Sequence, residues 1–487
     1  MNKSSNQKSE DFCLKSYFEK KENDERINIP VKNIQNEDLI YFENFLKTNN
    51  KLKSIILSEG DTEGYKNIFQ SLKNFDKITS LSISLFQKIK NFENLFEFLK
   101  KTKKLEHLLV RFDGSFEALK NVFNCLKFNN SIKNLDLAYN RIRYDACKII
   151  GQMIKENKSV INLNLNGNDI NDGLIFLVDA LEKDETIEEL SLSHNKIFED
   201  YFEEIGRLIE KIKHIEKLNL SNNLSATTGS KIIGNSLLQN TTLRELNLSE
   251  NNLRNSGAIE LAYGLEENKS LEILCISGNK IRAQGMVEIF LSLESNQHLT
   301  CLDISKQNIY GKSDSKQISE SLYSLLKNNQ TIKMLNVSQN QFKPDIIGLG
   351  LKFNYSLENI DLEDNKFKLS TPGSFSRFCT HLIENKTLKT LKLSNNILED
   401  ERAKYVAHLI SKNDTLKSLD FRNCGISYDG AQIICEAVRL NNSLTELEIG
   451  INILDKDFKN MLKKNFDRIH LPGLINIKIK NLNFIFK

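Results

Sequence analysis

The sequence lacks features that several common classes of protein need. Tryptophan is absent and only four prolines occur in 487 residues, so we expect short, regular turns, which favour repetition over several unrelated domains. No stretch reaches the roughly 18 uninterrupted apolar residues of a membrane span. Residues 1–10 are polar and have no apolar core of a secretory signal. We therefore predict a cytoplasmic protein without a membrane segment.

Cysteine pairs and an excess of one charge are also missing. The eight cysteines are scattered without a CxxC pair, a pattern typical of buried free thiols in a reducing compartment. Lysine and arginine number 67 against 64 aspartates and glutamates, a net charge of +3. No strong field therefore attracts the chain to nucleic acid or to a membrane surface.

Motifs for catalysis and for cofactors do not occur. The sequence has no GxxxxGK(S/T) phosphate loop, no GxGxxG dinucleotide fingerprint and no GxSxG nucleophile motif. Its seven histidines fall at no metal-ligand spacing. We predict no enzymatic activity, no cofactor and no metal.

What the sequence does have is one repeated phrase, LxxLxLxxNxL. One copy runs from Leu243 to Leu253 and the next from Leu271 to Ile281. Fifteen copies begin at residues 52, 78, 105, 132, 160, 187, 215, 243, 271, 299, 332, 357, 388, 416 and 444, so the usual unit is 28 residues long. Self-similarity at this period indicates a repeat architecture.

Each unit combines two periodicities. The LxL core alternates apolar and polar residues, which predicts a short strand with one buried face. From Gly257 to Leu265 the apolar residues are three and four apart and Asn268 follows, which predicts a helix. Strands stack at about 4.8 Å but helices pack at about 8 to 10 Å, so the stack must curve. The predicted fold is an α/β solenoid, a horseshoe with a concave parallel β-sheet and convex α-helices, of about 15 repeats.

An asparagine column follows the strands, where the chain turns inward. An amide at this place can satisfy backbone groups that the turn leaves unpaired. The predicted structural ladder consists of Asn140, Asn168, Asn195, Asn223, Asn251, Asn279, Asn340, Asn365, Asn396 and Asn452. Gln307 and Cys424 occupy the same column, so we expect the ladder to be imperfect there.

This pattern resembles leucine-rich repeat proteins of the ribonuclease-inhibitor-like subclass, over roughly residues 35 to 470. The resemblance implies fully α/β units and a rigid, curved surface. We expect a polar, disordered N-terminal tail over residues 1–34, the solenoid over residues 35–454 and a C-terminal cap over residues 455–487. The alternating segment from Ile475 to Phe486 is expected to be a capping edge strand or, alternatively, a strand that binds a partner.

The repeats are irregular between the copies that begin at residues 299 and 388. Five residues are inserted around 311–317, three are lost near Pro344, and three are inserted around 371–375. Insertions in solenoids form loops on one rim, which often bind partners. This stretch also carries an acidic patch, for which the alternative is a solvated charge cluster. With three concave positions added, the candidate partner-binding residues are Glu358, Asp361, Glu363, Asp364, Asp303, Asp136 and Tyr139.

We therefore predict a non-catalytic scaffold that binds another protein, not nucleic acid, on its concave face and irregular rim. A GTPase-activating protein of the Ran type is an alternative, although the apolar and basic C-terminus from Ile475 to Lys487 departs from the acidic tail of those proteins. The helix phrase from Gly257 to Leu271 also resembles the sensing repeats of immune receptors, so a stand-alone sensor is a second alternative. A cytoskeletal or ciliary location, or export as an effector, stays open.

Overall fold

The computed structural model describes residues 14–450, apart from residues 22, 32–33, 35, 59, 61, 74, 86–92, 113–115, 224–226, 308 and 310. The chain divides into two compact units, residues 1–196 and residues 197–487. Both units repeat the same element pair, a short parallel strand followed by a helix. Within the described part, none of the helices is both long enough and apolar enough to cross a bilayer.

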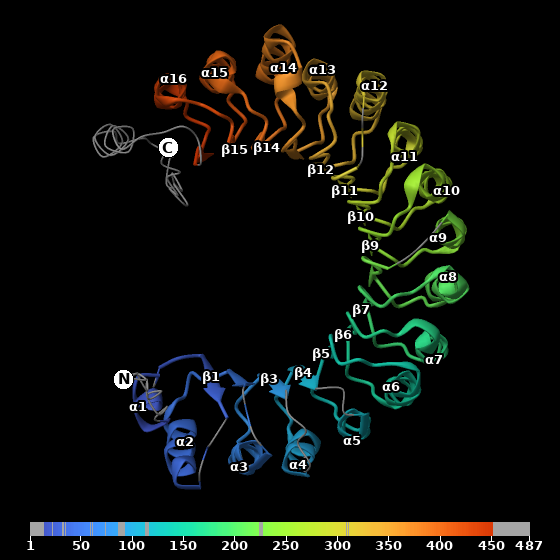
Figure 1. The fold of residues 1–487 in the computed structure, drawn as a ribbon, viewed down its shortest axis with the longest axis vertical. Coiled ribbons are helices and arrows are strands. Elements are labelled where there is room, and N and C mark those ends of the chain that lie inside the picture. Colours follow the sequence, from blue (N-terminus) through green and yellow to red (C-terminus); the bar gives the residue numbers. More distant parts are fainter. Residues whose placement is uncertain are drawn as a thin grey trace, which may run out of the picture. The chain divides into compact units, whose positions relative to one another are not determined.

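In the first unit the described strands follow one another in the sheet in chain order. Its helices lie on the outer side of the strands (Figure 1). The strands are β1 Arg26–Pro30, β2 Ser54–Ser58, β3 Ser80–Leu85, β4 His107–Phe112, β5 Asn134–Asp136, β6 Asn162–Asn164 and β7 Glu189–Ser191. The helices are α1 Leu14–Glu19, α2 Asn36–Thr48, α3 Thr62–Leu72, α4 Glu93–Lys101, α5 Phe116–Leu126, α6 Tyr144–Glu156 and α7 Leu174–Leu181, with the 3-10 turn η1 Asn171–Gly173.

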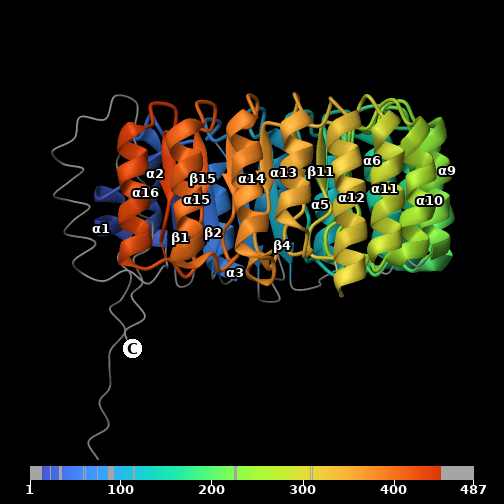
Figure 2. The ribbon, with the colours of Figure 1, turned by 90° about the horizontal axis from the view of Figure 1, so that it is seen from above.

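The second unit continues this pattern, and its helices stand side by side in Figure 2. Its strands are β8 Lys217–Asn219, β9 Glu245–Asn247, β10 Ile273–Cys275, β11 Cys301–Asp303, β12 Met334–Asn336, β13 Asn359–Asp361, β14 Thr390–Lys392, β15 Ser418–Asp420 and β16 Glu446–Glu448. Its helices are α8 Phe202–Lys211, α9 Thr227–Gln239, α10 Arg254–Glu267, α11 Ala283–Ser295, α12 Lys312–Asn328, α13 Pro344–Phe353, α14 Pro372–Glu384, α15 Glu399–Lys412 and α16 Tyr428–Leu440, with the 3-10 turns η2 Glu199–Tyr201 and η3 Phe367–Leu369.

The core of each repeat lies between its strand and its helix. The central leucines of neighbouring strands are buried and in register, as Leu246 of β9 is with Leu274 of β10. On the other side of the core, α10 buries Ala258, Leu261 and Leu265. Burial of one face of each element stabilises the stack, since no repeat can cover its apolar face alone. The predicted fold class, strands inside and helices outside, is confirmed within each unit.

The solenoid begins one strand earlier than the repeat phrase predicts. Residues 1–34 were expected to be a disordered tail, but α1 and β1 lie within this range. Ile27 and Ile29 of β1 are buried and pair with Ile55 and Leu57 of β2, and the ring of Phe18 stacks on α2. The expectation was wrong for Leu14–Glu19 and Arg26–Pro30, because this copy has no asparagine column and charged neighbours mask its alternation. The described strands consequently number sixteen rather than fifteen.

The irregular repeats do not form the loops that insertions predict. The residues inserted around 311–317 extend α12, which has 17 residues. The deletion near Pro344 shortens α13 to 10 residues. The residues added around 371–375 form the N-cap of α14, Thr371, and the first turn of that helix. Asn452, the predicted cap at residues 455–487 and its alternating segment lie outside the described residues.

A buried asparagine ladder joins neighbouring repeats behind the strands. In the second unit, the Asn251 side chain donates to the carbonyl oxygens of Leu220 at 3.0 Å and Leu248 at 2.9 Å. Its Oδ1 accepts from the backbone N–H of Asn223 at 2.9 Å. Each ladder amide thus pairs backbone groups of its own repeat and of the preceding one, which fixes the strand spacing.

The two exceptions in the ladder differ from each other. Gln307 keeps the full pattern, because its amide donates to Ile276 O at 2.8 Å and accepts from the backbone N–H groups of Asn279 and Ile281. The expected imperfection is therefore wrong at this position. At Cys424 only a thiol contacts the carbonyl of Leu393, at 3.3 Å, and a thiol is a weaker donor than an amide.

A second row of asparagines closes the helices. Asn268 donates to Leu237 O at 2.7 Å and accepts from the backbone N–H of Leu271 at 2.8 Å. Equivalent bonds join the preceding repeat to Asn129, Asn157, Asn240, Asn296, Asn329, Asn354, Asn385, Asn413 and Asn441. Asn-x-Ser/Thr phrases recur in the sequence, for example at Asn268–Ser270. This row shows that they are structural elements at the end of the helices.

Candidate functional site

The concave strand face is the candidate binding surface. Each three-residue strand buries its central apolar residue, and the residues before and after it face the other way. Within each unit the described helices lie on the opposite side of the strands (Figure 1). This face therefore presents two side chains per repeat at a fixed spacing.

The predicted acidic patch surrounds β13, and its carboxylates are paired. Glu358 accepts from Lys389 at 2.7 Å and Asp361 accepts from Lys392 at 3.0 Å, both from the next repeat. The hydrogen bond from Lys389 also lowers the pKa of Glu358. Because Glu358 and Asp361 each have a lysine beside them, this part of the patch presents ion pairs rather than a negative field.

The two remaining carboxylates of this patch lie in the turn after β13. Glu363 accepts from the side-chain amide of Asn395 at 2.5 Å, and Asp364 pairs with Lys366 at 2.5 Å. The structure thus brings all four predicted acidic residues of the second unit's patch onto one strand and its turn.

The other three predicted residues belong to other strands or turns than this patch. Asp303 is half-buried on β11 and accepts from the backbone N–H of Ser305 at 3.0 Å. Asp136 of the first unit pairs with Arg111 at 2.8 Å. Tyr139 is 64% exposed in the turn after β5, with a positive φ of 57°. Within the second unit, Asp303 on β11 is therefore separated from the patch on β13 by strand β12.

The last two described strands carry an ion-pair network that the sequence pattern did not indicate. Arg422 donates to both carboxylate oxygens of Asp420, at 3.0 and 2.6 Å, and pairs with Glu448 at 3.0 Å. The Asp420 side chain is only 8% exposed, and its hydrogen bond raises the pKa of Arg422. The available signal was an arginine in a column that is otherwise mostly serine.

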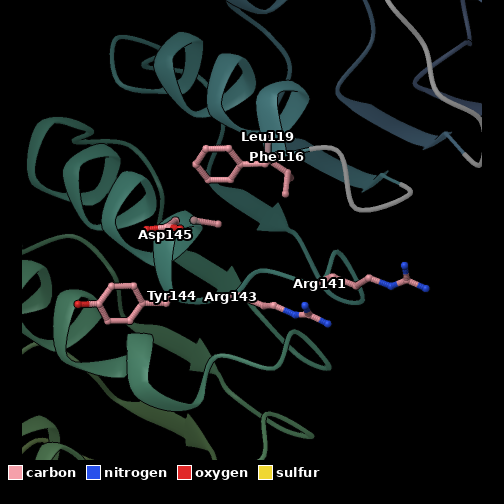
Figure 3. Close-up of a pocket in the computed structure, with 7 residues that line it drawn as sticks. Phe116, Leu119, Arg141, Arg143, Tyr144 and Asp145 are labelled. Carbon is pink, nitrogen blue, oxygen red and sulfur yellow. The ribbon is translucent and has the colours of Figure 1, made fainter.

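A shallow cavity of about 400 Å³ lies in the first unit between α5 and α6. Phe116 and Tyr144, each 40% exposed, line it together with Arg141 and Arg143 (Figure 3). The two arginines extend in the same direction from the segment before α6 (Figure 3). Asp145 also lies in its wall, so the cavity carries both charges and favours no single ligand.

No group of three or more histidines, cysteines, aspartates or glutamates in the described part of the chain has a geometry that could hold a metal ion. The cysteines that the structure describes are free thiols, and five of these seven are buried. Burial raises the pKa of the Cys147 thiol to about 12, which keeps it protonated and unreactive at neutral pH.

Comparison with known proteins is consistent with this geometry. A family model described as "Leucine Rich repeat" matches residues 239–262 and 412–435. Mouse NACHT, LRR and PYD domains-containing protein 14 is 29% identical over 157 residues, 31% of this chain and 15% of that protein. Mouse ribonuclease inhibitor is 28% identical over 134 residues, 27% of this chain and 29% of the inhibitor.

Two further proteins are similar to parts of this chain. Rho GTPase-activating protein gacW of Dictyostelium discoideum is 31% identical over 108 residues, 22% of this chain and 10% of that protein. A solved chain from a TLR13–single-stranded RNA complex aligns with a TM-score of 0.43 and 15% identity, covering 85% of this chain and 49% of that one. The matches to these curated relatives span less than a third of each relative's length.

Proposed function

We propose that this chain, a leucine-rich repeat protein with ribonuclease-inhibitor-like units, is a non-catalytic scaffold that holds a protein partner on its concave strand face. The observation that carries the proposal is the regular presentation of two outward side chains on every short strand. Stacked repeats give such surfaces rigidity, and repeat proteins use them for binding. A rigid surface loses little conformational entropy when a partner binds.

The ladder supports this proposal in physical terms. Amides such as Asn251 and Asn279 are at most 1% exposed and connect each strand to the next. The outward side chains therefore stand on a preorganised frame. Binding through many dispersed contacts requires such a frame, since each exposed polar contact contributes little by itself.

A protein fits the charge of this surface better than a nucleic acid does. The net charge of the chain is only +3, and the lysines beside β13 are already paired with Glu358 and Asp361. Phosphate backbones require free cations. We propose the paired acidic residues of the second unit and Tyr139 of the first unit as polar and aromatic contacts for a protein, with no cofactor and no chemical step.

A relative supports the class of function. Mouse ribonuclease inhibitor is named for inhibiting an enzyme that is itself a protein, an action that requires binding rather than turnover. For this chain we propose a location in the cytoplasm, which the unpaired thiols among the described cysteines favour.

Site-specific photo-crosslinking in cells tests the proposal. Benzoylphenylalanine replaces Asn359, which lies half-buried on concave β13, or Leu291, which is 48% exposed on helix α11. We expect discrete protein adducts from position 359 and far fewer from the helix control. Adducts from position 291 alone would contradict a concave interface. The absence of adducts from both positions, while the chain co-purifies with a partner, would also contradict it.

A further inference from the structure

The concave face of the second unit carries an uneven distribution of apolar side chains. Its nine strands, β8 to β16, present two outward residues each. Among these positions only four are apolar or sulfur-containing, and all four lie on the consecutive strands β10, β11 and β12. They are Ile273, Cys275, Cys301 and Met334, here called the apolar patch.

Strand register places the four side chains next to one another. Cys301 of β11 pairs with Ile273 on one side and with Met334 on the other. Cys275 lies two residues beyond Ile273 on the same strand. Met334 is 44% exposed, and the other three are half-buried. Cys275 and Cys301 are also the only described cysteines that are not buried.

The repeats themselves serve as controls for this patch. At the position of Ile273 the six strands of the unit outside the patch carry Lys217, Glu245, Asn359, Thr390, Ser418 and Glu446, so the fold does not require an apolar side chain there. An exposed apolar cluster surrounded by polar residues marks an interaction surface. Methionine also adapts its shape to a partner.

Two carboxylates without an ion-pair partner among the described residues flank the patch. Glu245 of β9 pairs in register with Ile273, and Asp303 of β11 pairs with Cys275. Both are half-buried, and neither forms an ion pair with another described residue. Burial, followed by the nearby Asp303, Cys301 and Glu245, raises the pKa of the Cys275 thiol to about 12. By contrast, Asp361 and Asp420 on the same face have cations beside them.

We propose that the apolar patch receives a protein segment in which a large apolar side chain stands next to a lysine or arginine. The apolar side chain packs on Ile273, Cys301 and Met334. The cation pairs with Glu245 or Asp303 and satisfies a carboxylate that the chain itself leaves without a counterion. The inference rests on the proposed scaffold function and names the chemistry of its partner.

Selection of displayed peptides on the full chain tests this inference. A library of random dodecapeptides is panned on the immobilised protein, and the most enriched peptide is synthesised and titrated by fluorescence anisotropy. We expect enriched peptides with an aromatic or aliphatic residue beside lysine or arginine. Enrichment of acidic peptides, or no enrichment, would overturn the proposal.

Variants of the full chain locate the binding. The double variant Ile273→Ser and Met334→Ser introduces the residue that Ser418 provides at the same strand position, and we expect binding at least about tenfold weaker. Glu245→Lys introduces the residue found at Lys217, and the expected loss is again about tenfold. The matched controls are Tyr263→Ser with Leu291→Ser, which remove exposed apolar side chains from helices, and Glu446→Lys. Circular dichroism and thermal melting verify that each variant is folded.

The possible outcomes separate this inference from the scaffold function. If patch variants bind the peptide as the unaltered chain does, the patch is not the site. In that case protein adducts from position 359 would still support the scaffold. If sedimentation shows a dimer of the chain that the double variant abolishes, the patch binds a second copy and the proposed basic partner is wrong.

Discussion

Replacement of the ladder residue Asn279 by alanine tests the force that holds the repeats in register. The Asn279 side chain is fully buried and donates to Leu248 O at 2.8 Å and to Ile276 O at 2.9 Å. Its Oδ1 accepts from the backbone N–H of Asn251 at 2.8 Å. Both carbonyls have a second amide donor, from Asn251 and Gln307 respectively.

The size of the change in the free energy of unfolding follows from these hydrogen bonds. The buried N–H of Asn251 loses its Asn279 acceptor, which costs about 1–3 kcal/mol, and each of the two carbonyls loses one amide hydrogen bond at roughly 0.5–1.5 kcal/mol. We therefore expect Asn279→Ala to lower the free energy of unfolding by about 4 kcal/mol. Asn279→Asp has nearly the same shape but replaces the donor by an acceptor, so it should also be strongly destabilising.

Urea denaturation of the full chain, followed by circular dichroism, measures this loss. Hydrogen exchange of the peptide that contains Asn251 reports whether the damage is local. The control is Asn235→Ala, an exposed position within α9, where we expect a change of at most about 0.5 kcal/mol. If Asn279→Ala lowers the free energy of unfolding by less than about 1 kcal/mol, the claim that the ladder holds neighbouring strands in register is refuted.

Three further substitutions or measurements test other features. Ile397 is a β-branched residue with a φ of 48° and 44% exposure, so Ile397→Asn should raise the free energy of unfolding by about 1 kcal/mol in urea titration; no gain would contradict the strain. A methyl group at Gly264 of α10 would collide with the backbone of Gly234 in α9. Gly264→Ala should therefore destabilise by about 1–3 kcal/mol, whereas Gly373→Ala, where the nearest atom is 3.8 Å away, should leave the melting temperature almost unchanged. Because burial raises the pKa of Cys275 from 9.0 to about 12, its neutral form stabilises the fold below pH 9, and this contribution is lost as the pH rises toward 12. Alkylation of Cys275 at pH 8, followed by mass spectrometry, should be at least about 100-fold slower than in urea; equal rates would contradict its burial.

The sequence predicted the repeated elements because their signals are local and recur. The LxL phrase gave strands centred on residues such as Leu246 and Leu274, and the asparagine column gave the ladder that includes Asn251. Because the same pattern recurs in many copies, an irregular residue in one copy does not hide it. The copy at β1 was missed because it shares only the alternation of Ile27 and Ile29 with the others.

The candidate site was less predictable because it depends on neighbours across repeats. Glu358 and Asp361 gave an acidic patch, yet their counterions come from Lys389 and Lys392, 31 residues later in the chain. Alignment of the copies would have shown these pairs, since both members occupy the same column. The network around Arg422 and the apolar patch also emerge only when adjacent strands are placed in register.

Modification of the native patch thiols tests the central claim, that a partner binds the concave face of β10 to β12. Cys301 is half-buried beside Met334, so it reports occupancy without any substitution. With saturating selected peptide or cross-linked partner, we predict that the rate of Cys301 modification by N-ethylmaleimide falls at least about fivefold. An unchanged rate at full occupancy would show that the partner binds elsewhere.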